Sequence, residues 1–293
     1  MTGPEYRCGV LWARALLAAM VLAWLSPLWA KTTVFYPQPE SVDARQAYPL
    51  KVLALALTKA GADFELLPSR SVMTQSRALI QLSRGVGADV NVVWTMTSKE
   101  REDTFLPIRI PIDKGLLGWR IFLIHRSKAA QFATVKTLND LKKYEAGQGH
   151  DWPDTDILRA SGLRVQGIAK YDGLFKMLES GRIDYFPRSV VEIWAEEKSH
   201  SDMELEIEKT VILQYPAALY FFVKKDNTAL ASVIEAGMRI AVKDGSFDKL
   251  FAEEYEGDIK RANLKARTRF QLPNPLLPEQ TPLQDKKLWF GDL

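Results

Sequence analysis

The first third of the chain alternates short β-branched or aromatic runs with longer stretches of helical periodicity. Pro37 is expected to end the first strand, Asp43 to cap the first helix and Gly61 to stop it. The predicted order is a strand at 31–36, a helix at 43–60, a strand at 64–67, a helix at 71–84 closed by Gly85, and a strand at 88–93. This alternation predicts a mainly parallel sheet with helices on its faces.

After Pro107 and Pro111 the same kind of pattern restarts, which indicates a crossing into a second body of structure. The expected elements are strands at 118–125, around Val165, and at 183–186, 207–213 and 219–223, with helices at 138–144, 153–161, 172–180, 189–198, 230–243 and 247–255.

Two passages repeat one design, LIQLSRGVGADVNVV and FKMLESGRIDYFP. Each is an amphipathic helix, a glycine stop and an aspartate that opens a strand. The chain is therefore predicted to form two lobes of similar construction. From Gly257 onward the sequence is rich in proline, and a strap over the surface is expected rather than a domain.

The N-terminus has the pattern of a secretory signal peptide. Arg7 and Arg14 precede an apolar run that ends in Leu28-Trp29-Ala30. The run is shorter than the ~20 residues that a membrane span needs, so cleavage after Ala30 is expected rather than an anchor.

Charge and cysteine content exclude several classes of function. Without residues 1–30 the chain has 37 basic and 35 acidic residues, which gives no reason to expect a nucleic-acid or anionic-membrane partner. The one cysteine, Cys8, lies in the leader, so the mature chain can form no disulfide and has no thiol for catalysis or metal binding. The three histidines show no metal spacing, and no cofactor is expected.

The order of several short motifs resembles the type II periplasmic solute-binding proteins, in particular the polar amino-acid-binding group (family 3). The motifs run in order over about residues 32–256: Gly85-x-x-Ala88-Asp89-Val90, Thr97-Ser98-Lys99-Glu100-Arg101, Pro107…Pro111…Gly115, Gln148-Gly149, Gly181-Arg182-Ile183-Asp184, and Asp244-Gly245-Ser246-Phe247-Asp248-Lys249. Their order and spacing carry the resemblance, since each motif alone is common.

The resemblance implies an α/β fold with two lobes and two crossover hinge strands. Lobe 1 would comprise residues 31–114 and 214–293, including the strap 257–293, and lobe 2 residues 115–213. A monomeric protein in the periplasm would capture a small solute between the lobes, close on its hinge and deliver the solute to the permease of an ABC transporter.

In lobe 1 the resemblance implies that Arg101 binds the carboxylate of the ligand through a bidentate fork. The alternative is a surface arginine paired with a neighbouring glutamate. Thr95 and Thr97 would add polar contacts, while Trp94 would be an aromatic wall or part of the core. Tyr36 is expected to stack on the ligand, and Ser41 is a weaker candidate.

In lobe 2 the start of the helix at 153 makes His150 and Trp152 candidate ligand contacts. The alternative is that Asp151 caps this helix and Trp152 packs inward. Arg188 occupies the region where amino-acid binders place an acid for the ligand ammonium. With Arg101 opposite, the cleft could hold a ligand with two anionic groups or a polar acid without an α-amine, unless Arg188 only pairs with Glu192.

Two other functions share this fold. A periplasmic dehydratase would need a general acid beside the carboxylate grip, for which Glu192 or His150 are the candidates. No catalytic or metal-binding constellation is identifiable, so we expect a binding protein rather than an enzyme. The same protein could instead load a membrane sensor kinase with ligand, and the sequence leaves this alternative open.

Overall fold

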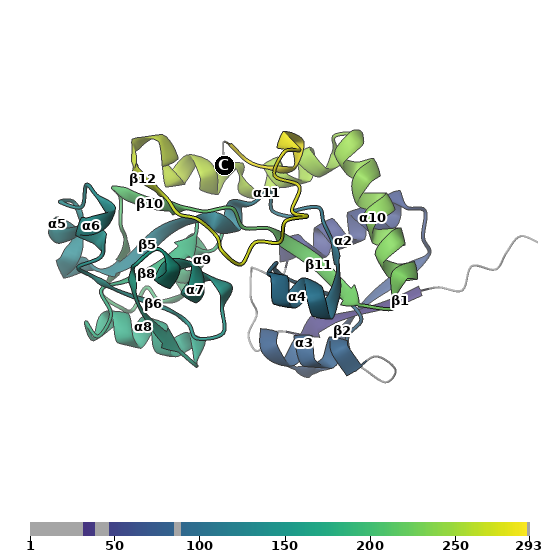
Figure 1. Ribbon diagram of the computed structural model, residues 1–293, viewed down its shortest axis with the longest axis horizontal. Coiled ribbons are helices and arrows are strands. Elements are labelled where there is room, and N and C mark those ends of the chain that lie inside the picture. Colours follow the sequence, from purple (N-terminus) through teal and green to yellow (C-terminus); the bar gives the residue numbers. More distant parts are fainter. Residues whose placement is uncertain (1–31, 39–46, 85–88, 292–293) are drawn as a thin grey trace, which may run out of the picture.

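The computed structural model describes residues 32–38, 47–84 and 89–291, which form two lobes lying side by side (Figure 1). The predicted leader, together with Lys31, Ser41, Asp43, Gly85 and Ala88, lies outside these residues. Within them, no helix is both long enough and apolar enough to cross a membrane.

Lobe 1 contains a pair of parallel strands, β1 and β2, and a sheet in the order β3-β11-β4. Its elements are β1 (Thr32–Gln38), α2 (Ala47–Lys59), β2 (Phe64–Val72), α3 (Gln75–Arg84), β3 (Val93–Met96), α4 (Lys99–Thr104), β4 (Phe105–Ile108), β11 (Leu219–Lys224), α10 (Thr228–Lys243) and the start of α11 (Ser246–Ala262).

Lobe 2 is built on one sheet in the order β12-β10-β5-β8-β6-β7, with β9 paired to β5. Its elements are η2 (Leu116–Gly118), β5 (Trp119–His125), η3 (Arg126–Lys128), α5 (Ala129–Phe132), α6 (Leu138–Leu141), β6 (Glu145–Gly149), α7 (Pro153–Ala160), β7 (Arg164–Ile168), α8 (Tyr171–Glu179), β8 (Tyr185–Ser189), α9 (Ile193–Ser199), β9 (Leu205–Ile207), β10 (Val211–Gln214), η4 (Leu264–Ala266) and β12 (Thr268–Gln271). A further turn, η5 (Lys286–Leu288), lies near the C-terminus.

The two-lobed α/β prediction is confirmed. Parallel pairing is seen between β1 and β2, between β6 and both β7 and β8, and between β10 and β12. The antiparallel pairs all involve β5 or β11, the strands that follow the two crossings between the lobes. The segment from β4 to β5 and the segment from β10 to β11 therefore run in opposite directions.

The two crossings touch where the lobes meet. The first connects β4 to β5 and the second connects β10 to β11. The Tyr215 N–H donates to the Gly118 carbonyl oxygen at 3.1 Å. A Cβ at Gly118 would lie 2.0 Å from the Tyr215 carbonyl oxygen, so only glycine allows the two segments to approach this closely.

Lobe 1 has an equally close contact between its helices. α2 buries the face that carries Tyr48, Val52, Leu53, Ala56 and Leu57, and it packs against α10. A Cβ at Gly237 in α10 would lie 1.7 Å from the Ala56 carbonyl oxygen. The absence of a side chain at this position therefore sets the distance between the two helices.

Three predicted boundaries in the chain are wrong. β1 continues through Pro37, and the helix expected at 71 begins at Gln75, because β2 extends to Val72 and pairs with Gln38 there. The strand expected at 207–213 is divided into β9 and β10. The buried carboxylate of Glu208 accepts from the N–H groups of Thr210 and Val211 and forms a turn.

The third strand of lobe 1 also begins later than predicted, at Val93 rather than at residue 88. The N–H groups of Asn91 and Val92 donate to the Phe35 carbonyl oxygen at 3.0 and 3.3 Å, and the Asn91 side chain adds two further hydrogen bonds to β1. Its Oδ1 accepts from the Phe35 N–H at 2.8 Å, and its Nδ2 donates to the Thr33 carbonyl oxygen at 3.2 Å. This amide joins β1 to the segment that leads into β3.

The C-terminal region differs from the predicted strap in two respects. α11 continues through the exposed Gly257 to Ala262, supported by buried Phe251 and Tyr255. β12 then pairs in parallel with β10, so this part of the chain belongs to the sheet of lobe 2 and not to lobe 1. Residues 273–291 return across the front of the molecule (Figure 1).

The first crossing contains a buried carboxyl group whose titration we expect to affect stability. Asp113 is 1% exposed and accepts from the N–H groups of Gly115 and Leu117. Burial raises its pKa to about 6, although both hydrogen bonds and nearby Arg120 oppose the rise. Because the pKa is raised on folding, the stabilisation is present below pH 4 and is lost as the pH rises through about 6.

We therefore predict that Asp113→Asn removes a pH dependence of about 3 kcal/mol at most in the free energy of unfolding between pH 4 and pH 7. Urea unfolding of both proteins at the two pH values measures this. The wild-type protein should lose stability relative to the variant as the pH rises. Parallel pH profiles would show that Asp113 titrates normally.

Candidate functional site

Arg101 is placed by a capped turn at the end of β3. Ser98 is the N-cap of α4, and its Oγ accepts from the Arg101 N–H at 3.2 Å. This cap is the local reason for the Ser98-to-Arg101 spacing noted in the sequence. It directs the arginine back over the strand end, toward lobe 2.

The Arg101 guanidinium is partly buried and well oriented. Its Nη1 donates to the Thr95 Oγ1 at 2.9 Å and to the Met96 carbonyl oxygen at 2.7 Å. Its Nη2 makes one long contact, 3.4 Å, with the Gln75 side-chain oxygen. Within the described residues it forms no ion pair, so the suggested pairing with Glu100 or Glu102 does not occur.

The electrostatic surroundings of Arg101 come largely from the other lobe. Burial lowers its pKa, and the carboxylates of Asp151 and Asp154 in lobe 2, followed by Glu100, oppose that change. Asp151 also accepts a hydrogen bond from the Ser76 hydroxyl of α3. This hydrogen bond joins the lobes directly, and it lies beside the guanidinium.

The two threonines predicted beside Arg101 have different positions. Thr95 contacts the guanidinium directly, whereas Thr97 is fully buried. The Thr97 hydroxyl donates to Glu102 at 2.6 Å, and Glu102 in turn accepts from Arg109. Thr97 therefore anchors α4 to its strand within lobe 1.

Tyr36 and Trp94 lie together at the ends of β1 and β3. Their ring centroids are 6.2 Å apart, and Trp94 meets the buried Phe221 edge-on at 6.3 Å. Both rings are only partly buried. Trp94 therefore contacts the core through Phe221 and is also partly exposed beside Tyr36.

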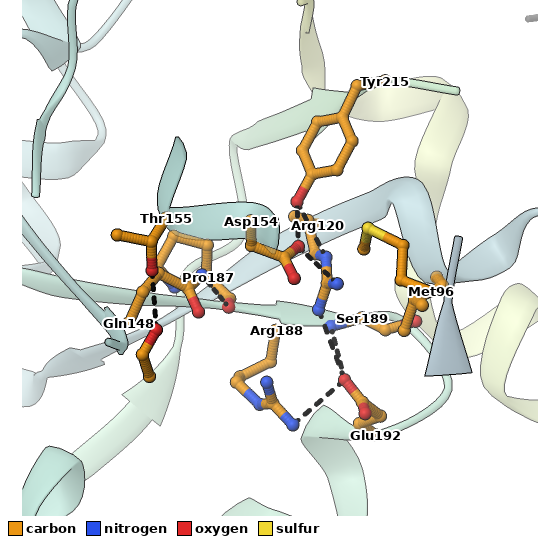
Figure 2. Close-up of polar contacts among 12 residues, drawn as sticks. Met96, Arg120, Gln148, Asp154, Thr155, Pro187, Arg188, Ser189, Glu192 and Tyr215 are labelled. Carbon is orange, nitrogen blue, oxygen red and sulfur yellow. Dashed lines mark hydrogen bonds and ion pairs between the residues drawn. The ribbon is translucent and has the colours of Figure 1, made fainter. Parts of the chain in front are cut away.

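The facing part of lobe 2 is a buried network of charges (Figure 2). Arg120 lies between Asp154 at 2.5 Å and Glu192 at 3.3 Å, and it also donates to the Tyr215 hydroxyl at 3.1 Å. That hydroxyl donates to Asp154. Burial would lower the pKa of Arg120, but Asp154, Tyr215 and Glu192 outweigh it and raise the pKa.

Arg188 continues the same network. It contacts Glu196 at 2.7 Å and Glu192 at 3.0 Å, and its guanidinium lies 4.9 Å from the Trp152 ring centroid. Burial opposes the charge of Arg188, yet Glu192 and Glu196 raise its pKa well above the usual value. The pairing with Glu192 raised from the sequence is present, and Glu196 is a second partner that the sequence analysis did not consider.

His150 and Trp152 flank the start of α7. The His150 side chain is exposed, with its Nδ1 3.9 Å from an Asp151 carboxylate oxygen. Trp152 is half-buried, stacks on Phe186 at 6.3 Å and lies directly over Gly149. Trp152, not Asp151, is the N-cap residue of α7, and the Asp151 side chain points to lobe 1 instead.

The structure brings the predicted residues Arg101 and Thr95 into contact, and it places Ser76, Gln75 and Arg120, which were not predicted, in the same region. Ser76 and Gln75 gave no signal because a polar residue early in an amphipathic helix is common. Arg120 had one available signal, a charge inside the otherwise apolar run of β5. No three His, Cys, Asp or Glu side chains within the described ranges gather as a metal site.

Comparison with solved structures identifies the fold. An ancestral arginine-binding protein bound to arginine has 17% identity and a TM-score of 0.56, and the match covers 77% of this chain and 98% of that one. The probable extracellular-binding protein of an amino-acid ABC transporter from Bacillus subtilis has 17% identity, a TM-score of 0.57 and coverage of 78% and 98%. A histidine kinase sensor domain with similarity to periplasmic binding proteins has 14% identity, a TM-score of 0.56 and coverage of 77% and 96%.

The chain thus has the two-lobed fold of the periplasmic solute-binding proteins, as its motifs suggested. No protein-family model and no curated protein matches the sequence. The solved neighbours named above are binding or sensor proteins rather than enzymes.

The contrast between Arg101 and Arg188 yields a stability prediction. Arg188→Met leaves Glu196 and Glu192 with less counter-charge in a buried site, which should cost about 3–5 kcal/mol of unfolding free energy. Arg101→Met leaves no acid unpaired and should change stability by ~1 kcal/mol or less. Urea unfolding of the two variants measures both changes in the free energy of unfolding. Equal losses of stability would mean that the charge of Arg101 also stabilises the fold.

Proposed function

We propose that this protein is a solute-binding protein that holds a small carboxylate-bearing solute between its lobes, with Arg101 binding the carboxylate. One observation carries the proposal. The three buried arginines, Arg120, Arg188 and Arg267, each have an acidic partner within 3.5 Å, and Arg101 has none among the described residues. A partly buried cation without a counter-ion is costly unless an anionic ligand supplies one.

The donors left on Arg101 suit a carboxylate. Its two Nη1 hydrogens are used by Thr95 and Met96, and one Nη2 hydrogen is directed at Gln75. The Nε–H and one Nη2–H make no hydrogen bond with the described residues, so two donors are left for a carboxylate. Thr95 then acts by fixing the orientation of the guanidinium.

The charges of lobe 2 favour a solute that also carries a positive group. The network holds three carboxylates, Asp154, Glu192 and Glu196, against Arg120 and Arg188. Asp151 adds a further carboxylate beside Arg101. An amino-acid-like zwitterion therefore suits the site better than the dianion considered from the sequence, since Arg188 is already neutralised.

The remaining candidates fit around this pair of charges. Tyr36 and Trp94 would cover the apolar part of the solute, and His150, which is exposed near Asp151, would contact it from lobe 2. Thr97, Trp152 and Arg188 would support the site from within the lobes, because their polar groups or rings already have partners.

For the cellular role, we propose a monomer in the periplasm, exported through the leader at 1–30, that passes its solute to an ABC permease. Amino-acid ABC transporter binding proteins among the structural neighbours support this. The sensor-domain neighbour supports signalling through a membrane kinase as the second candidate. A dehydratase has no comparable support, because Glu192 serves as counter-ion to two arginines.

The first test is a thermal-shift screen of residues 31–293 against amino acids, monocarboxylates and dicarboxylates. A solute at ~100 times its dissociation constant should stabilise the protein by about 2.7 kcal/mol. For the best hit, Arg101→Ala should weaken binding by about 30-fold or more, the effect of about 2 kcal/mol expected for removing one partner of a charge pair. Arg77→Ala, an exposed arginine on α3 of the same lobe, is the matched control. Equal affinity of the two variants would refute the assignment of Arg101.

A second prediction concerns the positive group of the solute. Asp151→Asn should reduce affinity for an amino acid but leave affinity for the corresponding acid without the amino group nearly unchanged, because only the former has a cation for Asp151. Isothermal titration of both compounds against both proteins measures the difference. An equal loss of affinity for the two compounds would mean that Asp151 acts only through its hydrogen bond with Ser76 and does not contact the positive group.

A further inference from the structure

Residues 246–291 take a path between the lobes in addition to the two hinge crossings. α11 begins in lobe 1, where Phe247 and Phe251 are buried and Asp248 pairs with Lys114 at 2.6 Å. At its other end, Arg261 lies 4.1 Å from the ring centroid of Trp194 in α9 of lobe 2, and it pairs with Glu197 at 3.6 Å. One helix is thus fixed to both lobes, as its course over the junction in Figure 1 shows.

The chain is then secured to lobe 2 by a strand. All four residues of β12 pair with β10, and the Thr268 N–H donates to the Thr210 carbonyl oxygen at 2.7 Å. The buried Arg267 donates to the carbonyl oxygens of Glu208 and Val211 at 2.7 and 3.1 Å. These contacts make β12 an integral strand of the lobe 2 sheet.

Residues 273–291, which we call the return strap, go back to lobe 1. Asn274 donates to the Pro216 carbonyl oxygen of the second crossing at 2.8 Å. The Leu276 carbonyl oxygen accepts from the Lys99 N–H at 3.0 Å, which satisfies a free donor at the start of α4. The strap therefore holds the short helix that carries Arg101.

The end of the strap closes on the first crossing. The Phe290 N–H donates to the Lys114 carbonyl oxygen at 2.8 Å, and the Phe290 ring meets Trp119 at 5.6 Å. Trp289 is 5% exposed and packs on Gly115. Both crossings are thus bound from outside by the strap, although a cavity of about 300 Å³ remains between Gln214-Tyr215-Pro216 and Gln271-Leu272-Pro273.

We propose that α11, β12 and the return strap form a brace that fixes the angle between the lobes, so that the protein does not open and close freely on its two hinge crossings. A rotation of the lobes must bend α11, or pull its end from α9, or detach the strap from α4. The described part of the chain thus contains connections between the lobes besides the two hinge crossings. The inference does not depend on the identity of the solute.

The test measures the distance between the lobes in the protein without added solute. The mature chain has no cysteine, so Ser83→Cys in α3 and Glu179→Cys in α8 allow two spin labels to be placed at exposed sites on different lobes. Ser83→Cys with Lys243→Cys gives a pair within lobe 1 and serves as the reference. Pulsed electron–electron double resonance should give a distribution of interlobe distances that is as narrow as the distribution for the reference pair. A clearly broader or divided distribution would overturn the proposal.

The strap is then cut after folding, at a protease site inserted between the exposed Glu279 and Gln280, and the piece 280–293 is removed by gel filtration. If the piece stays bound, a chain that ends at Leu272 replaces it, with circular dichroism to verify the fold. The same site between Ser201 and Asp202, in a turn of lobe 2, is the control cut. Loss of the strap should broaden the distribution of interlobe distances and leave the distances of the reference pair unchanged. No change after the strap is lost would contradict its role in the brace.

Discussion

The proposed binding site depends on a partly buried arginine that makes no ion pair with any described residue. Arg101 is kept in place by neutral acceptors, Thr95 and Met96, which orient the guanidinium without cancelling its charge. The cap at Ser98 and the strap contact at Lys99 stabilise the turn that presents it. The lobe thereby carries a fixed positive charge whose counter-ion has to come from elsewhere.

In lobe 2 the buried arginines are paired with carboxylates of the same lobe. Its buried charges are matched internally, in a network where each arginine contacts two carboxylates and Tyr215 from the second crossing contributes a hydroxyl. Such a network is weak evidence for stability, because desolvation offsets the attraction. The network contains one carboxylate more than it has arginines, and its Asp154 acts electrostatically on Arg101. The polarity of the two faces, positive on lobe 1 and negative on lobe 2, matches a solute that carries both charges.

The sequence predicted what depends on local pattern. Hydrophobic periodicity and glycine stops located most helices and strands, and the Thr97-to-Arg101 motif located the arginine. Predicted boundaries were wrong where a side chain makes hydrogen bonds to the backbone, as Asn91 does beside β1 and Glu208 does before β10. The course of β12 was also missed, because a four-residue strand with alternate exposure has little signal until β10 offers it an edge.

Pairing between distant residues could not be predicted either. Glu196 and Arg188 lie eight residues apart, but Arg120, Asp154 and Tyr215 come from three separate parts of the chain. Nothing local in the sequence distinguishes an arginine that such partners will neutralise from one that they will not. This is why Arg101 and Arg188 looked equivalent in the sequence and differ in the structure.

The most direct measurement is a crystal structure of the mature protein with its best-binding solute. The account predicts density for a carboxylate on the Nε and Nη2 edge of Arg101, with the positive group of the solute facing Asp151 and the Arg188 pairs intact. A solute bound to Arg188 with its pairs to Glu192 and Glu196 broken, or bound away from Arg101, would contradict it.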